Sequence, residues 1–263
     1  MKYRIRALKV GGIKNAPLPE MLFMTGWGEW IDLNVYVWAI EGGERPVVVD
    51  TGIKDIELLT QTSIRPSRES VEERGNLEIH RWMQSPEERT DVALRKMGAK
   101  PKDVGYVILT HLHYDHFSNI SLFPNAKIVV SRKGLSEAVA PRHPQIGGAV
   151  PKDALCDLIS RPSELVQLAG KEEEVLPGIR VFWVGGHTPA DQAVSVQTSK
   201  GKAIITSDTV FLYRNIEENI PIGFFYNLEE CYDAMERIRG EADIVLPAHD
   251  PEVLKRHPGG RIP

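Results

Sequence analysis

The sequence has very little cysteine. Its 263 residues include two cysteines, Cys156 and Cys231, and they do not form a Cys-x-x-Cys pair. Two thiols are too few for the disulfide framework of a small secreted domain, and their spacing is not that of a thiolate metal site or a redox pair. The sequence therefore predicts a reduced, cytoplasmic protein whose stability does not depend on disulfides.

Long hydrophobic runs are also missing. The longest apolar runs, Val35–Ile40 and Tyr106–Leu109, are the size of strands, well below the roughly 18 residues that a membrane helix needs. The segment Met1–Val10 alternates Lys or Arg with apolar residues and contains no signal-peptide core. We expect neither a membrane span nor export.

The sequence has no excess of positive charge. Its 32 Lys and Arg residues are balanced by 36 Asp and Glu residues, which gives a formal net charge of −4. Nucleic-acid-binding domains usually carry a basic excess that neutralises phosphates, so the balance argues against a nucleic-acid partner. With 42% hydrophobic and 26% charged residues, the composition is that of an ordinary globular protein, and we expect one α/β domain over residues 1–263.

Short runs rich in β-branched residues recur along the chain and predict strands. The Ser199–Lys202 stretch has the composition of a hairpin turn and predicts that the runs on either side of it pair antiparallel. The eight predicted strands are Val35–Ile40, Val47–Val49, Tyr106–Leu109, Lys127–Val130, Arg180–Val184, Ala193–Val196, Ala203–Ile205 and Ile244–Leu246.

Two helices are predicted between these strands. Ser85 and Glu88 form a capping box that predicts a helix ending at Gly98, and Asn227–Gly240 has apolar residues spaced for one helical face. The stretches Gly11–Trp30 and Thr51–Gln84 show neither period, and we expect loops there.

The large apolar side chains of Met21–Trp30 leave two alternatives open: they cover the edge of the core, or they line a substrate site. The same alternatives apply to the aromatic residues Phe211, Tyr213, Phe224, Phe225 and Tyr226.

The segment 111–116 reads His-x-His-x-Asp-His and follows a predicted strand directly. If the backbone stays extended, His111, His113 and Asp115 project to one side and His116 to the other, so one segment can serve two neighbouring metals. Imidazole and carboxylate ligands suit Zn²⁺, Fe or Mn, and the lack of cysteine ligands argues against a structural zinc site.

Later strand-like runs end in further candidate ligands, which are His187, Asp208 and His249. Each alone would be an ordinary loop or turn residue. Together with the motif they give seven nitrogen and oxygen ligands, as a two-metal site requires. Asp50 is an eighth candidate, and we expect it to accept the ring N–H of a ligand histidine rather than to bind metal.

This pattern resembles the metallo-β-lactamase fold superfamily, from the Val-Val-Val-Asp-Thr-Gly segment at 47–52 through His249. The resemblance implies an α/β (α+β) fold, built as a four-layer αβ/βα sandwich, with two divalent metal ions at one edge, Zn²⁺ being preferred over Fe or Mn. It also implies a ligand set in which His111, His113 and His187 hold the first metal, Asp115, His116 and His249 hold the second, and Asp208 bridges them.

Within the superfamily, the sequence is most similar to the N-acyl homoserine lactone lactonases in the spacing of its ligands. True β-lactamases of this fold have cysteine or serine where Asp208 stands, and glyoxalase II carries a longer C-terminal extension after the last histidine. The chain departs from the lactonases at Phe211, where they usually have a tyrosine that helps to hold the substrate carbonyl. Tyr213 is the candidate replacement, with ordinary packing as the alternative.

The resemblance implies that a hydroxide bridging the two metals opens a lactone or similar ester, as in quorum quenching, and that Asp115 protonates the leaving alkoxide. The expected partner is a small-molecule lactone or ester, and nothing in the sequence excludes a homodimer. Three alternatives stay open: a glyoxalase II-like thioesterase, a mononuclear iron persulfide dioxygenase that uses His111, His113 and His187, and a non-catalytic ligand-binding scaffold.

Overall fold

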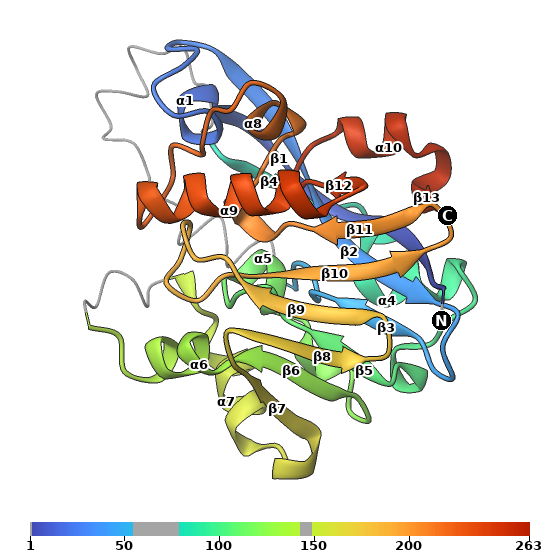
Figure 1. Ribbon diagram of the computed structural model, residues 1–263. Helices are drawn as coiled ribbons and strands as arrows, with labels where there is room; N and C mark the ends of the chain where they lie inside the picture. The colour runs from blue at the N-terminus through green and yellow to red at the C-terminus, as the bar shows by residue number, and fades with distance from the viewer. Residues whose placement is uncertain (1, 55–78, 143–148) are drawn as a thin grey trace.

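A computed structural model of the protein describes residues 2–54, 79–142 and 149–263. Two β-sheets lie face to face and carry helices on their outer faces (Figure 1). The layers run helix, sheet, sheet, helix, so the predicted four-layer sandwich is confirmed. Within these described ranges, no helix combines the length and the apolar character needed to cross a membrane.

The larger sheet has eight strands in the order β13-β1-β2-β3-β5-β6-β7, with β4 paired to β1. The strands β3, β5, β6 and β7 run parallel, and the others pair antiparallel. Its members are β1 (Arg4–Pro17), β2 (Trp30–Glu41), β3 (Val47–Val49), β4 (Arg81–Met83), β5 (Tyr106–Ile108), β6 (Lys127–Ser131), β7 (Val166–Ala169) and β13 (Arg261–Ile262).

The smaller sheet has five strands in the order β12-β11-β10-β9-β8. The strands β10 and β11 form the antiparallel pair predicted from the turn between them, and β11 and β12 run parallel. Its members are β8 (Glu172–Leu176), β9 (Ile179–Trp183), β10 (Gln192–Thr198), β11 (Gly201–Ile205) and β12 (Ile244–Leu246).

Three hydrophobic clusters hold these layers together. One lies between the sheets and includes Trp38 and Val194. A second packs the outer face of the larger sheet against helices, and the third packs β9 to β11 against α9 (Figure 1). The helices are α1 (Leu18–Met21), α4 (Thr90–Lys96), α5 (Tyr114–Phe117), α6 (Arg132–Val139), α7 (Lys152–Ser160), α8 (Tyr213–Glu217), α9 (Leu228–Glu241) and α10 (Glu252–Arg256).

All eight predicted strands are present, and α9 begins after the N-cap Asn227 as expected. The helix predicted from Ser85 is partly wrong, because Pro86–Glu88 forms a 3-10 turn and α4 begins only at Thr90. The two cysteines are free, Cys156 exposed and Cys231 buried.

The loop predicted over Gly11–Trp30 is wrong in its first part, because β1 continues to Pro17 and α1 follows it. The register of β1 on β2 shifts after Lys9 and again after Ile13. Such bulges interrupt the alternation of inward and outward side chains, which hides a strand from pattern analysis. Of the second predicted loop, residues 55–78 lie outside the described residues, and Arg81–Met83 forms β4.

Candidate metal centre

The candidate ligands follow strands of both sheets, β5 in the larger and β9, β11 and β12 in the smaller. Because β11 and β12 are parallel neighbours, Asp208 and His249 emerge at the same edge. The backbone N–H of Gln192 donates to the carbonyl of Thr110 at 3.0 Å and ties the loop after His187 to the segment before His111. The seven side chains therefore meet at one end of the sandwich, and all but His113 belong to buried residues.

The prediction that the motif stays extended is wrong. His113 is the N-cap of α5, so Asp115 and His116 lie on a helical turn. Adjacent side chains on a helix do not point to opposite faces, as adjacent side chains on a strand do. The turn therefore directs Asp115 and His116 to one group of ligands, while His111 and His113 belong to the other.

Two groups of potential ligand atoms share Asp208. The first group is His111, His113 and His187, the second is Asp115, His116 and His249, and in each group the ligand atoms, with those of Asp208, lie within 4.8 Å of one another. Asp208 Oδ2 is 3.7 Å from His111 Nε2 and 3.6 Å from His187 Nε2. Asp208 Oδ1 is 3.2 Å from His116 Nε2 and 3.1 Å from His249 Nε2. Each carboxylate oxygen thus faces a different group.

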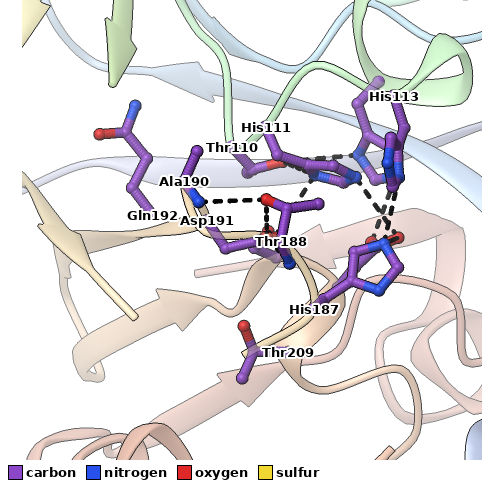
Figure 2. Close-up of polar contacts among 12 residues, drawn as sticks. Thr110, His111, His113, His187, Thr188, Ala190, Asp191, Gln192 and Thr209 are labelled. Carbon is purple, nitrogen blue, oxygen red and sulfur yellow. Dashed lines mark hydrogen bonds and ion pairs between the residues drawn. The ribbon is translucent and has the colours of Figure 1, made fainter. Parts of the chain in front are cut away.

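The first group contains two imidazoles, those of His111 and His113, that resist protonation. Burial, reinforced by neighbouring histidines, lowers the pKa of His111 well below its usual value and that of His113 to about 3. Their rings and that of His187 turn toward one another, with His113 Nδ1 3.1 Å from His187 Nε2 (Figure 2). His111 Nε2 is buried and has no hydrogen-bond partner. Neutral nitrogens that converge in this way fit a divalent cation.

The second group is richer in carboxylate. Burial alone would lower the pKa of His116, but Asp208, Asp115 and Asp50 together raise it well above the ordinary value. Burial alone would raise the pKa of Asp208, and His116, His249 and His111 hold it well below the usual range. His116 Nε2 makes ion-pair contacts with both carboxylates but no hydrogen bond. Two imidazoles and two carboxylates also fit a divalent cation.

Acceptors behind the histidines fix which ring nitrogen faces the site. The Nδ1 atoms of His187 and His249 each lie 2.8 Å from a backbone carbonyl, that of Phe224 and that of Asn34. His116 Nδ1 lies 2.8 Å from Asp50 Oδ2. A proton held on Nδ1 leaves the Nε2 lone pair free for a metal. Asp50 thus lies against a ligand histidine and has its own backbone in the left-handed region, at φ 62°.

Two residues near His111 escaped the sequence analysis. The Thr110 hydroxyl donates to Asp50 Oδ2 at 2.8 Å and lies 3.2 Å from His111 Nδ1. Asp191 Oδ1 lies 3.6 Å from the same nitrogen, and burial raises the pKa of this carboxyl to about 6. In the sequence, Asp191 is one more aspartate in a turn that follows Pro189, and no local pattern distinguishes it from a residue that caps a turn.

Aromatic side chains lie beside the two ligand groups, but Tyr213 is not one of them. The Phe211 ring lies 5.2 Å from the His249 ring and 5.6 Å from the His187 ring, centroid to centroid. Tyr213 opens α8 and packs in the core between the sheets, where the Arg256 guanidinium lies 3.7 Å from its ring. Among the described residues, its buried hydroxyl has no hydrogen-bond partner, and no hydrogen bond or ring contact joins its side chain to the candidate ligands.

The large apolar side chains of Met21–Trp30 do not all lie in the same environment. Met21 and Leu22 are buried in the core beneath the larger sheet. Met24 and Trp27 are exposed. The Phe23 ring packs edge-on against Phe225, and this joins the N-terminal loop to the segment whose Phe224 ring lies 5.4 Å from His187.

Comparison with known proteins agrees with this geometry. The sequence matches the metallo-beta-lactamase superfamily over residues 30–249. The chain belongs to this superfamily. An N-acyl homoserine lactonase from Bacillus sp is 27% identical over 230 residues, which are 86% of this chain and 84% of that protein. A second N-acyl homoserine lactonase, from Bacillus cereus, is 26% identical over 233 residues, 87% of this chain and 86% of the relative.

Solved structures of the superfamily share the fold. An N-acyl homoserine lactone hydrolase with the product N-hexanoyl-L-homoserine at its catalytic metal centre superposes with a TM-score of 0.78 at 22% identity, covering 97% of both chains. AidC, a dizinc quorum-quenching lactonase, gives a TM-score of 0.70 at 14% identity and covers 98% of this chain and 89% of that one. With its two His/Asp groups, the chain is a hydrolase of the metallo-beta-lactamase type whose ligand geometry is consistent with a dinuclear metal site.

Proposed function

We propose that this protein is a dinuclear metal-dependent lactonase that opens N-acyl homoserine lactones or similar lactones and esters, a reaction used in quorum quenching. The observation that supports it best is the position of Asp208, whose two oxygens face two separate ligand groups. A carboxylate in this position can bridge two cations and offset their repulsion. The relatives named as lactonases cover most of the chain.

Zn²⁺ is the proposed metal, and the proposed ligands are the residues of the two groups. His111, His113 and His187 would hold one ion, Asp115, His116 and His249 the other, and Asp208 both. Two such ions supply Lewis-acid polarisation of a carbonyl and a water acidic enough to react near neutral pH. A dizinc lactonase with the same fold supports this choice.

Asp115 is the candidate for the proton transfer to the leaving alkoxide. Its Oδ2 faces the second group, 3.3 Å from His116 Nε2 and 3.7 Å from His249 Nε2. Burial alone would raise the pKa of Asp115, but His116 and His249 lower it. In the proposed reaction Asp115 would accept a proton from the nucleophile and deliver it to the leaving alkoxide.

Substrate binding is proposed to use the aromatic side chains beside the first group. Phe211 and Phe224 both contact the His187 ring, and neither offers a hydrogen bond to a carbonyl oxygen. An apolar wall favours a substrate with an acyl chain or an apolar ring. Because no hydrogen bond or ring contact among the described residues joins Tyr213 to the candidate ligands, holding the substrate carbonyl would fall to the metals rather than to a tyrosine.

The test is a substrate panel with metal analysis of the purified protein. We expect close to two transition-metal ions per chain, loss of activity on chelation, and faster acid release from γ-lactones than from β-lactams or phosphodiesters at constant pH. Faster turnover of a glutathione thioester than of any lactone would instead identify a glyoxalase II-like enzyme. A single iron with oxygen consumption on a persulfide would identify the dioxygenase, and full activity without metal would refute every version.

A further inference from the structure

Asp191 is a buried carboxylate that the proposed chemistry does not use. It lies in the loop between His187 and β10 and is 0% exposed. Its Oδ2 accepts the backbone N–H of Thr188 at 2.6 Å and the Thr188 hydroxyl, and its Oδ1 accepts the Ser207 hydroxyl at 2.5 Å. No lysine or arginine among the described residues pairs with it. A buried carboxylate without a basic partner is costly, so its retention calls for a function.

The groups around Asp191 come from three segments, and each segment carries a candidate ligand. Ser207 directly precedes Asp208, and Thr188 directly follows His187. The third is His111 itself, whose Nδ1 lies 3.6 Å from Asp191 Oδ1 (Figure 2). Asp191 therefore contacts the neighbours of Asp208 and of His187 in the chain, and it also lies beside His111 itself. No comparable contact joins it to the second group.

Ser207 shows why the turn before Asp208 needs this support. Its φ is 60°, in the left-handed region that residues with a side chain rarely adopt. Strained backbone of this kind persists where surrounding contacts hold it in place. The hydrogen bond from Ser207 Oγ to Asp191 is such a contact, and the orientation of Asp208 depends on the same turn.

We propose that Asp191 is the positioning residue of the first metal site, fixing the Asp208 turn against the His187 loop and placing a negative charge behind His111. This proposal rests on the dinuclear site proposed above. A carboxylate accepts hydrogen bonds and the Thr110 hydroxyl already donates to Asp50, so both neighbours of His111 Nδ1 favour a proton on that nitrogen. The lone pair of His111 Nε2 then points toward the metal.

The test compares Asp191→Asn with the wild-type protein by titration with Co²⁺, without substrate. Asparagine keeps the shape of the side chain and can still accept from Ser207, but it removes the charge and turns an NH₂ donor toward the Thr188 N–H. Co²⁺ bound by three imidazoles and a carboxylate has visible bands distinct from those of Co²⁺ bound by two of each, so the titration resolves the two sites.

We expect Asp191→Asn to weaken Co²⁺ binding at the three-histidine site by about 10- to 100-fold and to shift its bands, with a smaller loss at the second site. Excess metal should then restore most of kcat. Ser207→Ala, which keeps the charge and removes one hydrogen bond, should weaken the same site less. Unchanged binding in Asp191→Asn, or a loss that is equal at both sites or larger at the second, would overturn the proposal.

Thr198→Val controls for general destabilisation. Thr198 is buried at the far end of β10, where its hydroxyl donates to the carbonyl of Gly201 and accepts the N–H of Lys200, so this change removes two partly buried hydrogen bonds away from the site. It should lower thermal stability and leave both Co²⁺ steps unchanged; if it reproduces the Asp191→Asn titration, Asp191 is merely structural. Wild-type protein that binds one Co²⁺ refutes the dinuclear function but still allows the comparison at that ion, and protein that binds none refutes both proposals.

Discussion

The two ligand groups are built from similar residues yet are electrostatically opposite. In the first group, burial and neighbouring histidines keep His111 and His113 unprotonated. In the second, three carboxylates around His116 favour its protonated form. The difference is one aspartate: the first group contains Asp208 and has Asp191 behind it, whereas the second contains both Asp208 and Asp115 and has Asp50 behind it. A metal in the first group thus displaces no proton from His111 or His113, whereas a metal in the second group replaces the proton of His116.

The strongest test of this comparison removes the residue that the groups share. Asp208→Ala should release at least one metal and lower kcat by more than 100-fold, because the bridging carboxylate sets the separation of the ions and offsets their repulsion. Metal content and kcat of the purified variant measure both effects. A variant that keeps two metals and a near-normal kcat would make Asp208 an ordinary turn residue.

Substituting a residue that lies behind one ligand group should weaken metal binding at that group first. Asp50→Asn should weaken the second metal by about 10- to 100-fold, because the Asp50 carboxylate accepts from His116 Nδ1 at 2.8 Å. A chelator competition with Zn²⁺ measures the two affinities separately. Loss of the first metal before the second would show that the two aspartates, Asp50 and Asp191, do not serve separate sites.

The number of protons that a metal displaces on binding should differ between the two groups. His116 has a pKa above its ordinary 6.5, so at pH 7 the metal-free protein holds a proton there that a second metal must expel. The first metal should release fewer protons, because His111 and His113 hold none at this pH. In the metal-free protein, the raised pKa of His116 stabilises the fold. This contribution to the free energy of unfolding is complete below about pH 6.5 and is lost as the pH rises through the pKa of His116 in the folded protein. A weakly buffered indicator dye follows the release, and equal release in both steps would contradict the comparison.

The smallest effect is expected at Tyr213. Its buried hydroxyl has no hydrogen-bond partner, so Tyr213→Phe should leave kcat and KM unchanged and raise the free energy of unfolding by about 1 kcal/mol. Denaturant unfolding and lactone kinetics measure the two quantities. A large fall in kcat would show that Tyr213 reaches the substrate after all and would restore the role expected from the sequence.

Sequence patterns predicted the parts of this protein that local physics controls. Buried β-branched runs mark strands wherever they occur, and the spacing of His111, His113, Asp115 and His116 is dense enough to predict a metal site without tertiary information. The N-cap of α9 is likewise local, since the Asn227 side chain accepts from the N–H of Glu230. By contrast, the two bulges in β1 obscured its alternation, and a real strand was taken for a loop.

Tertiary structure alone decided that Asp191 lies behind His111 and that Tyr213 packs in the core. Asp191 meets His111 because the loop after His187 docks on the end of β5, a contact between segments about 80 residues apart. Tyr213 was expected near the substrate, yet the start of α8 directs it into the core between the sheets. Sequence spacing specifies the chemical groups, whereas their orientation depends on long-range packing that no local pattern records.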